Sequence, residues 1–146
     1  MKPQLKRIFL ISLILTVIVN FTNAQWTQIG QDLDGINIED RSGYSVSSNG
    51  NGNIVAVGAI QNNGLNQPGY ARVFEFVSNS WVQLGNDING ESANDWFGYS
   101  IALNSTGDIL AVGGFQNDGN GVSAGHVRVF EYLDGEWPVS YTHIRA

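Results

Sequence analysis

Two acidic loops, each containing a glycine, hold the side chains of this sequence whose spacing is best suited to binding an ion. The loops read "DLDGINIED" and "DINGESAND", and their oxygen-bearing side chains are Asp32, Asp34, Glu39, Asp40, Asp87, Asn89, Glu91 and Asp95. Oxygen ligands on a loop of this kind are what Ca²⁺ prefers. The glycine stands fourth in each loop rather than sixth, so neither loop is an EF-hand.

The same loops also have a purely structural interpretation. Asp and Asn side chains commonly accept hydrogen bonds from the backbone of their own turn, which makes them frequent in connections between strands. We favour this interpretation and keep calcium as the alternative, since no other cofactor is indicated. The residues that calcium would use are Asp32, Asp34, Asp40, Asp87, Asn89 and Asp95.

Catalytic chemistry has little support in the sequence. His126 is the single histidine of the repeated region described below, and Tyr70 occupies the corresponding earlier position. Val127 and Val129 follow it in a strand-like pattern, which predicts a strand residue that is packed or lies at a blade edge. A nucleophile and a base must lie within reach of each other, and the sequence indicates no such partner. We therefore predict that this chain is not an enzyme.

An internal repeat sets the organisation of the chain. Trp26, Trp81 and Trp137 follow one another at spacings of 55 and 56 residues, and the two copies agree at 23 of 55 positions. The matches include glycines, such as Gly58 and Gly113, and apolar residues of the kind that form a core. A period of this length predicts a repeat architecture in which neighbouring copies pack on one another. We expect Trp26, Trp81, Phe130 and Tyr132 to pack between the copies rather than to form a platform for a sugar.

Each copy predicts four short strands. In the second copy, "GYSIAL" alternates apolar and polar residues, "NSTGD" predicts a turn, and "ILAVGG" predicts a strand buried on both faces. "HVRVFEYL" follows a long polar loop, and Asp134-Gly135 predicts a two-residue hairpin. Outside residues 1–24 no segment has a helical period, so the predicted class is all-β.

Four antiparallel strands in each copy favour a β-propeller, in which each copy is one blade. A single blade cannot cover both of its faces, so blades must stack. We expect two four-stranded antiparallel blades, forming a partial arc of a ring with six or seven blades. The strand that begins with tryptophan is expected to complete the blade of the preceding copy.

Residues 1–24 have the parts of a secretory signal peptide: basic residues at positions 2, 6 and 7, an apolar run from Ile8 to Val19, and small residues Thr22 and Ala24 before a cut. The alternative, a membrane anchor, needs roughly 18 apolar residues. Cleavage would leave four basic and 13 acidic residues, a net charge of −9. So acidic a chain is a poor partner for nucleic acid. We expect a secreted or cell-surface protein with no membrane span after cleavage.

The stretch "FGYSIALNSTGDILAVGG" resembles the FG-GAP repeat of integrin α-chain propellers. The longer pattern from Gln25 to Trp137 resembles an FG-GAP-like variant found in secreted proteins of the Bacteroidetes. This resemblance implies an extracellular propeller with six or seven blades, often within a larger protein exported by type IX secretion. Integrin-type repeats carry a calcium loop between the two motif strands, but "NSTG" and "NGNG" stand there in this chain. The first copy also has Ser42 where the family has phenylalanine.

The predicted organisation is a signal peptide at 1–24, repeat 1 at 25–80, repeat 2 at 81–137 and a tail at 138–146. The tail, "PVSYTHIRA", replaces the "VQLGND" that follows Trp81, and Pro138 cannot donate a ladder hydrogen bond. It resembles translated sequencing adapter, so we expect a non-native tail; the alternative is a native terminal strand that caps the arc.

Two functions follow as expectations. The first is a non-enzymatic binding or scaffold module, a fragment of a larger protein, whose partners are neighbouring blades and an unknown protein or glycan. The alternative is part of an exported polysaccharide-processing enzyme whose catalytic residues lie on other blades.

Overall fold

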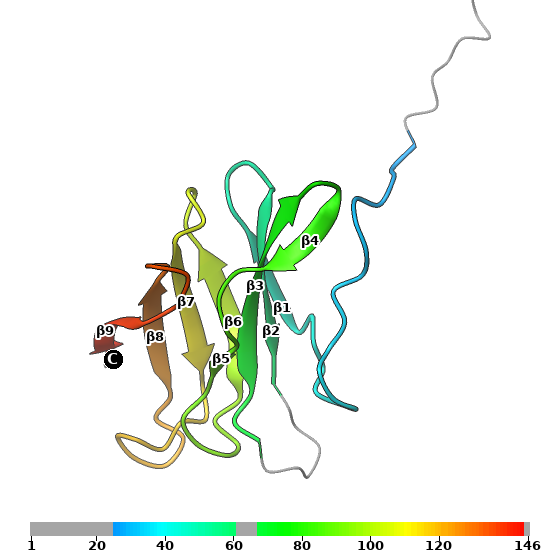
Figure 1. Ribbon diagram of the computed structural model, residues 1–146. Coiled ribbons are helices and arrows are strands. Elements are labelled where there is room, and N and C mark those ends of the chain that lie inside the picture. The colour runs from blue at the N-terminus through cyan, green and yellow to red at the C-terminus, as the bar shows by residue number, and fades with distance from the viewer. Residues whose placement is uncertain (1–24, 61–66, 145–146) are drawn as a thin grey trace, which may run out of the picture.

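The computed structural model describes residues 25–60 and 67–144, with side chains described up to residue 139. Within these ranges the chain contains strands and no helix, and the strands form two antiparallel sheets that lie beside each other (Figure 1). The all-β prediction is therefore confirmed. The predicted signal peptide and the loop at 61–66 lie outside the described residues.

The first sheet comes from repeat 1 and the start of repeat 2. Its strands are β1 (Ser45–Ser48), β2 (Ile54–Ala59), β3 (Tyr70–Val77) and β4 (Ser80–Gln83), in the order β1-β2-β3-β4. Strand β4 contains Trp81 and pairs with β3. The strand that begins a repeat thus completes the sheet of the preceding repeat, as the pattern predicted.

A fifth strand of this sheet was not predicted. Strand β5 (Ile88–Asn89) pairs with Ala71 and Tyr70 at the start of β3. It fits there because β4 pairs only with Phe74–Val77, the later part of β3, and leaves the earlier backbone groups of that edge unpaired. The prediction of four strands in this copy was therefore one strand short.

The second sheet repeats the same order. Its strands are β6 (Phe97–Leu103), β7 (Ile109–Gly114), β8 (His126–Glu131) and β9 (Val139–Ile144), in the order β6-β7-β8-β9. Strand β9 begins directly after Pro138 and pairs with β8 through two register shifts, whereas β4 pairs with β3 without one. Residues 139–144 of the predicted tail therefore continue the sheet, in a less regular register than their counterpart in repeat 1.

The predicted turns form as local chemistry requires. Asn104 caps the β6–β7 turn, because its Oδ1 accepts hydrogen bonds from the backbone N–H groups of Gly107, Asp108 and Ile109 at 2.9, 3.1 and 3.0 Å. Asp134 and Gly135 both have positive φ, at 52° and 89°, which is the geometry of a type I′ hairpin turn. Short-range polar groups thus set the connections between neighbouring strands.

The main core lies between the two sheets. One face of the first sheet contributes Ala56, Ala71 and Val73, and the facing side of the second contributes Leu110, Val112 and Phe130. All six are buried, and Phe97, at the start of β6, belongs to the same cluster. The alternation of side chains along each strand therefore divides each sheet into a face toward this core and a face away from it.

Candidate functional site

Asp40, one of the calcium candidates, is buried and holds the first acidic loop together. Its carboxylate accepts hydrogen bonds from the backbone N–H groups of Ile36, Asn37 and Ser42, at 2.8, 3.0 and 3.1 Å. The hydroxyl of Tyr70 on β3 donates a fourth hydrogen bond, at 2.6 Å. The loop and the sheet are thus joined through a single carboxylate.

The electrostatics of this pair favour a charged Asp40 and a neutral Tyr70. Burial alone would raise the pKa of Asp40, but the hydrogen bonds from Asn37, Tyr70, Ser42 and Ile36 together lower that pKa below its usual value of 3.8. Burial and the hydrogen bond to Asp40 raise the pKa of Tyr70 to about 12. A carboxylate held in this way is a structural acceptor rather than an acid or base.

Asp95 occupies the same position in the second copy and is also buried. It accepts hydrogen bonds from the N–H of Ser92 at 2.9 Å and from the side-chain amide of Asn117 at 2.8 Å. Asn117 belongs to the β7–β8 loop, so Asp95 links the second acidic loop to that loop. His126 stands where Tyr70 stands in the first copy. The two copies therefore keep the buried carboxylate and change its side-chain donor.

Arg72 and Arg128, which begin the sequence "RVFE" in β3 and β8, donate hydrogen bonds to the backbone of the acidic loops. Arg72 donates from Nη1 to the carbonyl oxygen of Asp34 at 3.0 Å, and Arg128 donates from Nη1 to the carbonyl oxygen of Asn89 at 3.1 Å. Arg72 also donates to Oε1 of Gln83, from Nε at 3.2 Å and from Nη2 at 3.0 Å. The sequence pattern alone assigned no role to these arginines. The signal that could have identified them was an arginine at the same position of both copies, on the apolar face of a strand, in an acidic chain.

Two further calcium candidates, Asp32 and Asp87, also contact protein groups, while Asp34 and Asn89 offer their backbone carbonyls to the arginines. Asp32 accepts a hydrogen bond from Nε2 of Gln28 at 2.8 Å, and Asp87 accepts the equivalent one from Gln83 at 2.9 Å. Asp87 lies 3.4 Å from Nε of Arg72 as well. Among the described residues no three His, Asp or Glu side chains lie together as metal ligands would. The recurrence of Asp32 as Asp87, and of Asp40 as Asp95, is thus matched by hydrogen bonds that each copy repeats.

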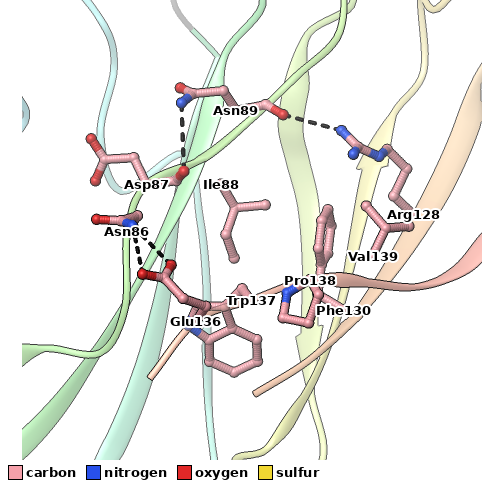
Figure 2. Close-up of a pocket in the computed structure, with 10 residues that line it drawn as sticks. All are labelled: Asn86, Asp87, Ile88, Asn89, Arg128, Phe130, Glu136, Trp137, Pro138 and Val139. Atoms are coloured by element: carbon pink, nitrogen blue, oxygen red, sulfur yellow. Dashed lines mark hydrogen bonds between the residues drawn. The ribbon is translucent and has the colours of Figure 1, made fainter. Parts of the chain in front are cut away.

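A recess of about 310 Å³ lies under the second acidic loop, and Figure 2 shows the residues around it. Asn86 donates to both carboxylate oxygens of Glu136, at 2.9 and 2.8 Å, across one side of the recess. The guanidinium of Arg128 lies 5.0 Å from the ring centroid of Phe130 on the other side. An equivalent recess, about 420 Å³, lies beside Arg72 in the first copy. The walls offer hydrogen bonds and an aromatic face but no paired nucleophile and base.

His126 is a packed strand residue, as predicted. Its side chain is almost fully buried and lies edge-on to Phe97, with ring centroids 6.1 Å apart. Its Nδ1 is 3.8 Å from a carboxylate oxygen of Glu91. The surroundings are those of a core position.

Two of the three repeating tryptophans join one copy to the next. Nε1 of Trp81 donates to the carbonyl oxygen of Ile29 at 3.0 Å, and Nε1 of Trp137 donates to that of Leu84 at 2.8 Å. Ile29 and Leu84 are equivalent positions, so the contact is repeated. Trp26 was also expected to pack, but it is 99% exposed. That expectation was wrong, because no strand of a preceding copy lies beside Trp26 among the described residues.

No protein-family model matches the chain, and no curated protein is similar to it. Among the described residues no helix is long and apolar enough to cross a membrane.

Proposed function

We propose that this chain is a non-enzymatic binding or scaffold module, two consecutive blades of an exported FG-GAP-like β-propeller. One observation supports the proposal above the others: the contacts that join one copy to the next are themselves repeated. The Trp81 indole donates to Ile29 and the Trp137 indole to Leu84. A chain that builds the same junction twice is suited to an architecture of stacked units.

The use of polar residues supports a binding role over catalysis. The carboxylates of Asp40 and Asp95, and the guanidinium groups of Arg72 and Arg128, contact other protein groups. Their work is to position loops at one end of the two sheets. Loops held by a rigid scaffold are where binding surfaces are commonly found.

The β7–β8 loop is the surface we propose for ligand binding. It is ordered by its own hydrogen bonds, including one from the N–H of Ser123 to Oδ1 of Asp118 at 2.6 Å. Its tip carries Val122, which is 93% exposed. Figure 1 shows the loop projecting beyond the strands at the end where β6 begins. A protein or a glycan is the ligand class that an acidic, exported chain is expected to meet.

The experiment uses the whole chain, produced with its N-terminal segment in a bacterial host and collected after export. We expect N-terminal sequencing to give Gln25 as the first residue. The exported chain is then tested for retention on starch, xylan, laminarin and extracellular-matrix proteins, while release of reducing sugar is measured in parallel. Val122→Asp should abolish retention, and Val82→Asp, an equal change on the exposed outer strand β4, should leave it unchanged.

Two results would contradict the proposal. Release of reducing sugar from any polysaccharide would favour a glycan-processing enzyme instead. Retention that Val122→Asp leaves intact would show that the β7–β8 loop is not the binding surface.

A further inference from the structure

A hollow of about 280 Å³ lies at the edge of the second sheet's outer face, the face away from the core. Its wall includes Ser100, Gly113, Phe115, Gly125, His126 and Val127. Most of this wall is apolar side chain or glycine backbone. The hollow therefore differs in chemistry from the polar recesses beside Arg72 and Arg128.

The equivalent surface of the first sheet is occupied by the start of β6. Ser45, the counterpart of Ser100, donates from Oγ to the carbonyl oxygen of Gly98 at 2.7 Å. The N–H of Phe97 donates to the carbonyl oxygen of Pro68 at 3.0 Å. Gly58, the counterpart of Gly113, must be glycine because a Cβ there would collide with the Gly98 carbonyl. The repeat thus builds a socket, and the Phe97-Gly98 dipeptide fills it in the first copy.

Exposure confirms that the second socket is open. Ala71 is fully buried by the docked strand, whereas its counterpart Val127 is 39% exposed. Ile60 is likewise fully buried, and its counterpart Phe115 is 44% exposed. Equivalent apolar side chains are therefore covered in one copy and solvent-exposed in the other.

The chain also carries a second segment that is equivalent to the one that fills the first socket. Ser42 and Gly43 occupy the positions of Phe97 and Gly98 in the first copy. Gly43 has φ of 86°, close to the 87° of Gly98, although a Cβ at Gly43 would meet no atom within 4 Å. The segment thus holds the docking conformation with nothing docked against it.

The change from phenylalanine to serine keeps the glycine carbonyl that the socket serine binds. The contacts that hold the dipeptide in the first socket are made by backbone atoms, the N–H of Phe97 and the carbonyl of Gly98. The Phe97 ring lies in the core between the two sheets, with its centroid 6.3 Å from that of Phe130. Ser42-Gly43 retains the Gly43 carbonyl and the positive φ, whereas the N–H of Ser42 already donates to Oδ1 of Asp40 at 3.1 Å.

We propose that the hollow at Ser100 and Val127 is a docking site for the Ser42-Gly43 segment of a second copy of this chain. The association is head-to-tail, with Ser100 Oγ donating to the carbonyl oxygen of the incoming Gly43. Such a contact uses two different surfaces, so successive copies form either an open filament or a closed ring, depending on the rotation that relates one copy to the next. The inference rests on the proposed stacking of repeated units and adds to it the partner and the contact.

Two substitutions test the two sides of this contact separately. Val127→Lys places a charge on the socket wall at a side chain that is already exposed in the single chain. In the first socket, a Cβ at Gly98 would collide with the carbonyl oxygen of Tyr70. Gly43→Ala should therefore place a methyl group against the carbonyl oxygen of His126, the counterpart of Tyr70, when the segment docks. The matched controls are Val82→Lys on β4 and Gly52→Ala, a turn glycine with φ of 71° and nothing within 4 Å of a Cβ.

Sedimentation velocity of the exported whole chain, over a wide concentration range, provides the measurement. We expect the unsubstituted chain and both controls to form larger species as concentration rises. Val127→Lys and Gly43→Ala should each weaken association at least tenfold and remain monomeric. A mixture of the two should give a one-to-one dimer, because each variant keeps the surface that the other has lost. Thermal melts identify any variant that fails to fold, and in that case the other variant, on the opposite side of the contact, still tests it.

Several outcomes would overturn the proposal. The first is an unsubstituted chain that stays monomeric at every concentration. Association that survives both substitutions, or that Gly43→Ala leaves unchanged, would mean that another segment or another protein occupies the socket. Failure of the mixture to dimerise would exclude the head-to-tail geometry. Retention of Val127→Lys on the ligands is measured separately, so failure of this docking proposal can be distinguished from failure of the proposed binding function.

Discussion

Gly98 and Gly43 form a natural matched pair for testing how closely the two sheets approach each other. They occupy the same repeat position and have nearly the same φ, 87° and 86°. They differ in surroundings: a Cβ at Gly98 would collide with the Tyr70 carbonyl and lie 3.0 Å from the amide nitrogen of Ala59, whereas a Cβ at Gly43 would meet nothing within 4 Å. We predict that Gly98→Ala destabilises the fold far more than Gly43→Ala.

The expected magnitudes follow from three contributions. A left-handed φ costs an alanine about 1–2 kcal/mol relative to glycine, and both variants incur this cost. Gly98→Ala also forces the first sheet's backbone away, and overpacking of this kind costs about 1–3 kcal/mol. Losing the hydrogen bond from Ser45 to the Gly98 carbonyl adds about 1 kcal/mol. The free energy of unfolding should therefore fall by roughly 3–6 kcal/mol for Gly98→Ala and by about 1–2 kcal/mol for Gly43→Ala.

Urea unfolding followed by tryptophan fluorescence measures both values, at a concentration low enough to keep the chain monomeric. The difference between the variants contains the steric clash and the lost hydrogen bond from Ser45, because the conformational cost cancels. Equal destabilisation of the two variants, within about 0.5 kcal/mol, would refute the close approach of the two sheets at Gly98.

The remaining predictions concern the buried pair, the second arginine and calcium. Tyr70→Phe should lower the free energy of unfolding by about 1.5–3 kcal/mol, since it removes a hydrogen bond to a charged carboxylate. The raised pKa of Tyr70 stabilises the fold below the unfolded pKa of about 10 and this stability is lost as pH rises through the folded pKa of about 12, so the alkaline limb of a pH–stability curve should flatten in Tyr70→Phe. The lowered pKa of Asp40 acts oppositely: its stabilisation is present above the unfolded pKa and lost as pH falls through the folded value. Val139 stands where the first copy has a glutamine that binds its arginine, and Nε of Arg128 is buried without a hydrogen-bond acceptor. Val139→Gln should therefore raise the free energy of unfolding by about 0.5–1.5 kcal/mol, as measured by urea unfolding. No gain would show that β9 cannot present the glutamine side chain to Arg128. The melting temperature should differ by less than a few degrees between excess calcium and chelator, and a large rise in calcium would show that the acidic loops bind the ion.

Sequence reasoning predicted the strands better than it predicted the site. Alternation along "GYSIAL", the turn at "NSTGD" and the hairpin signal at Asp134-Gly135 are local features, and each formed as expected. Strand β5 was missed because two residues carry no period, and its pairing depends on an edge that β4 leaves open. The acidic loops were identified as the places where polar groups gather. The roles of Arg72 and Arg128 were not foreseen.

The amino-acid sequence by itself determined the elements and their repetition, because a period of two and the turn-forming residues act over a few neighbours in the chain. Only the tertiary structure decided which groups meet: Tyr70 reaches Asp40 across 30 positions, and Arg72 reaches Asp34 across 38. Ile54 and Ile109 make the same point, since they are the same residue at the same repeat position. Ile54 is partly buried against the core while Ile109 is exposed. Burial depends on whether a second sheet covers the face, and a pattern that is identical in both copies cannot encode that difference.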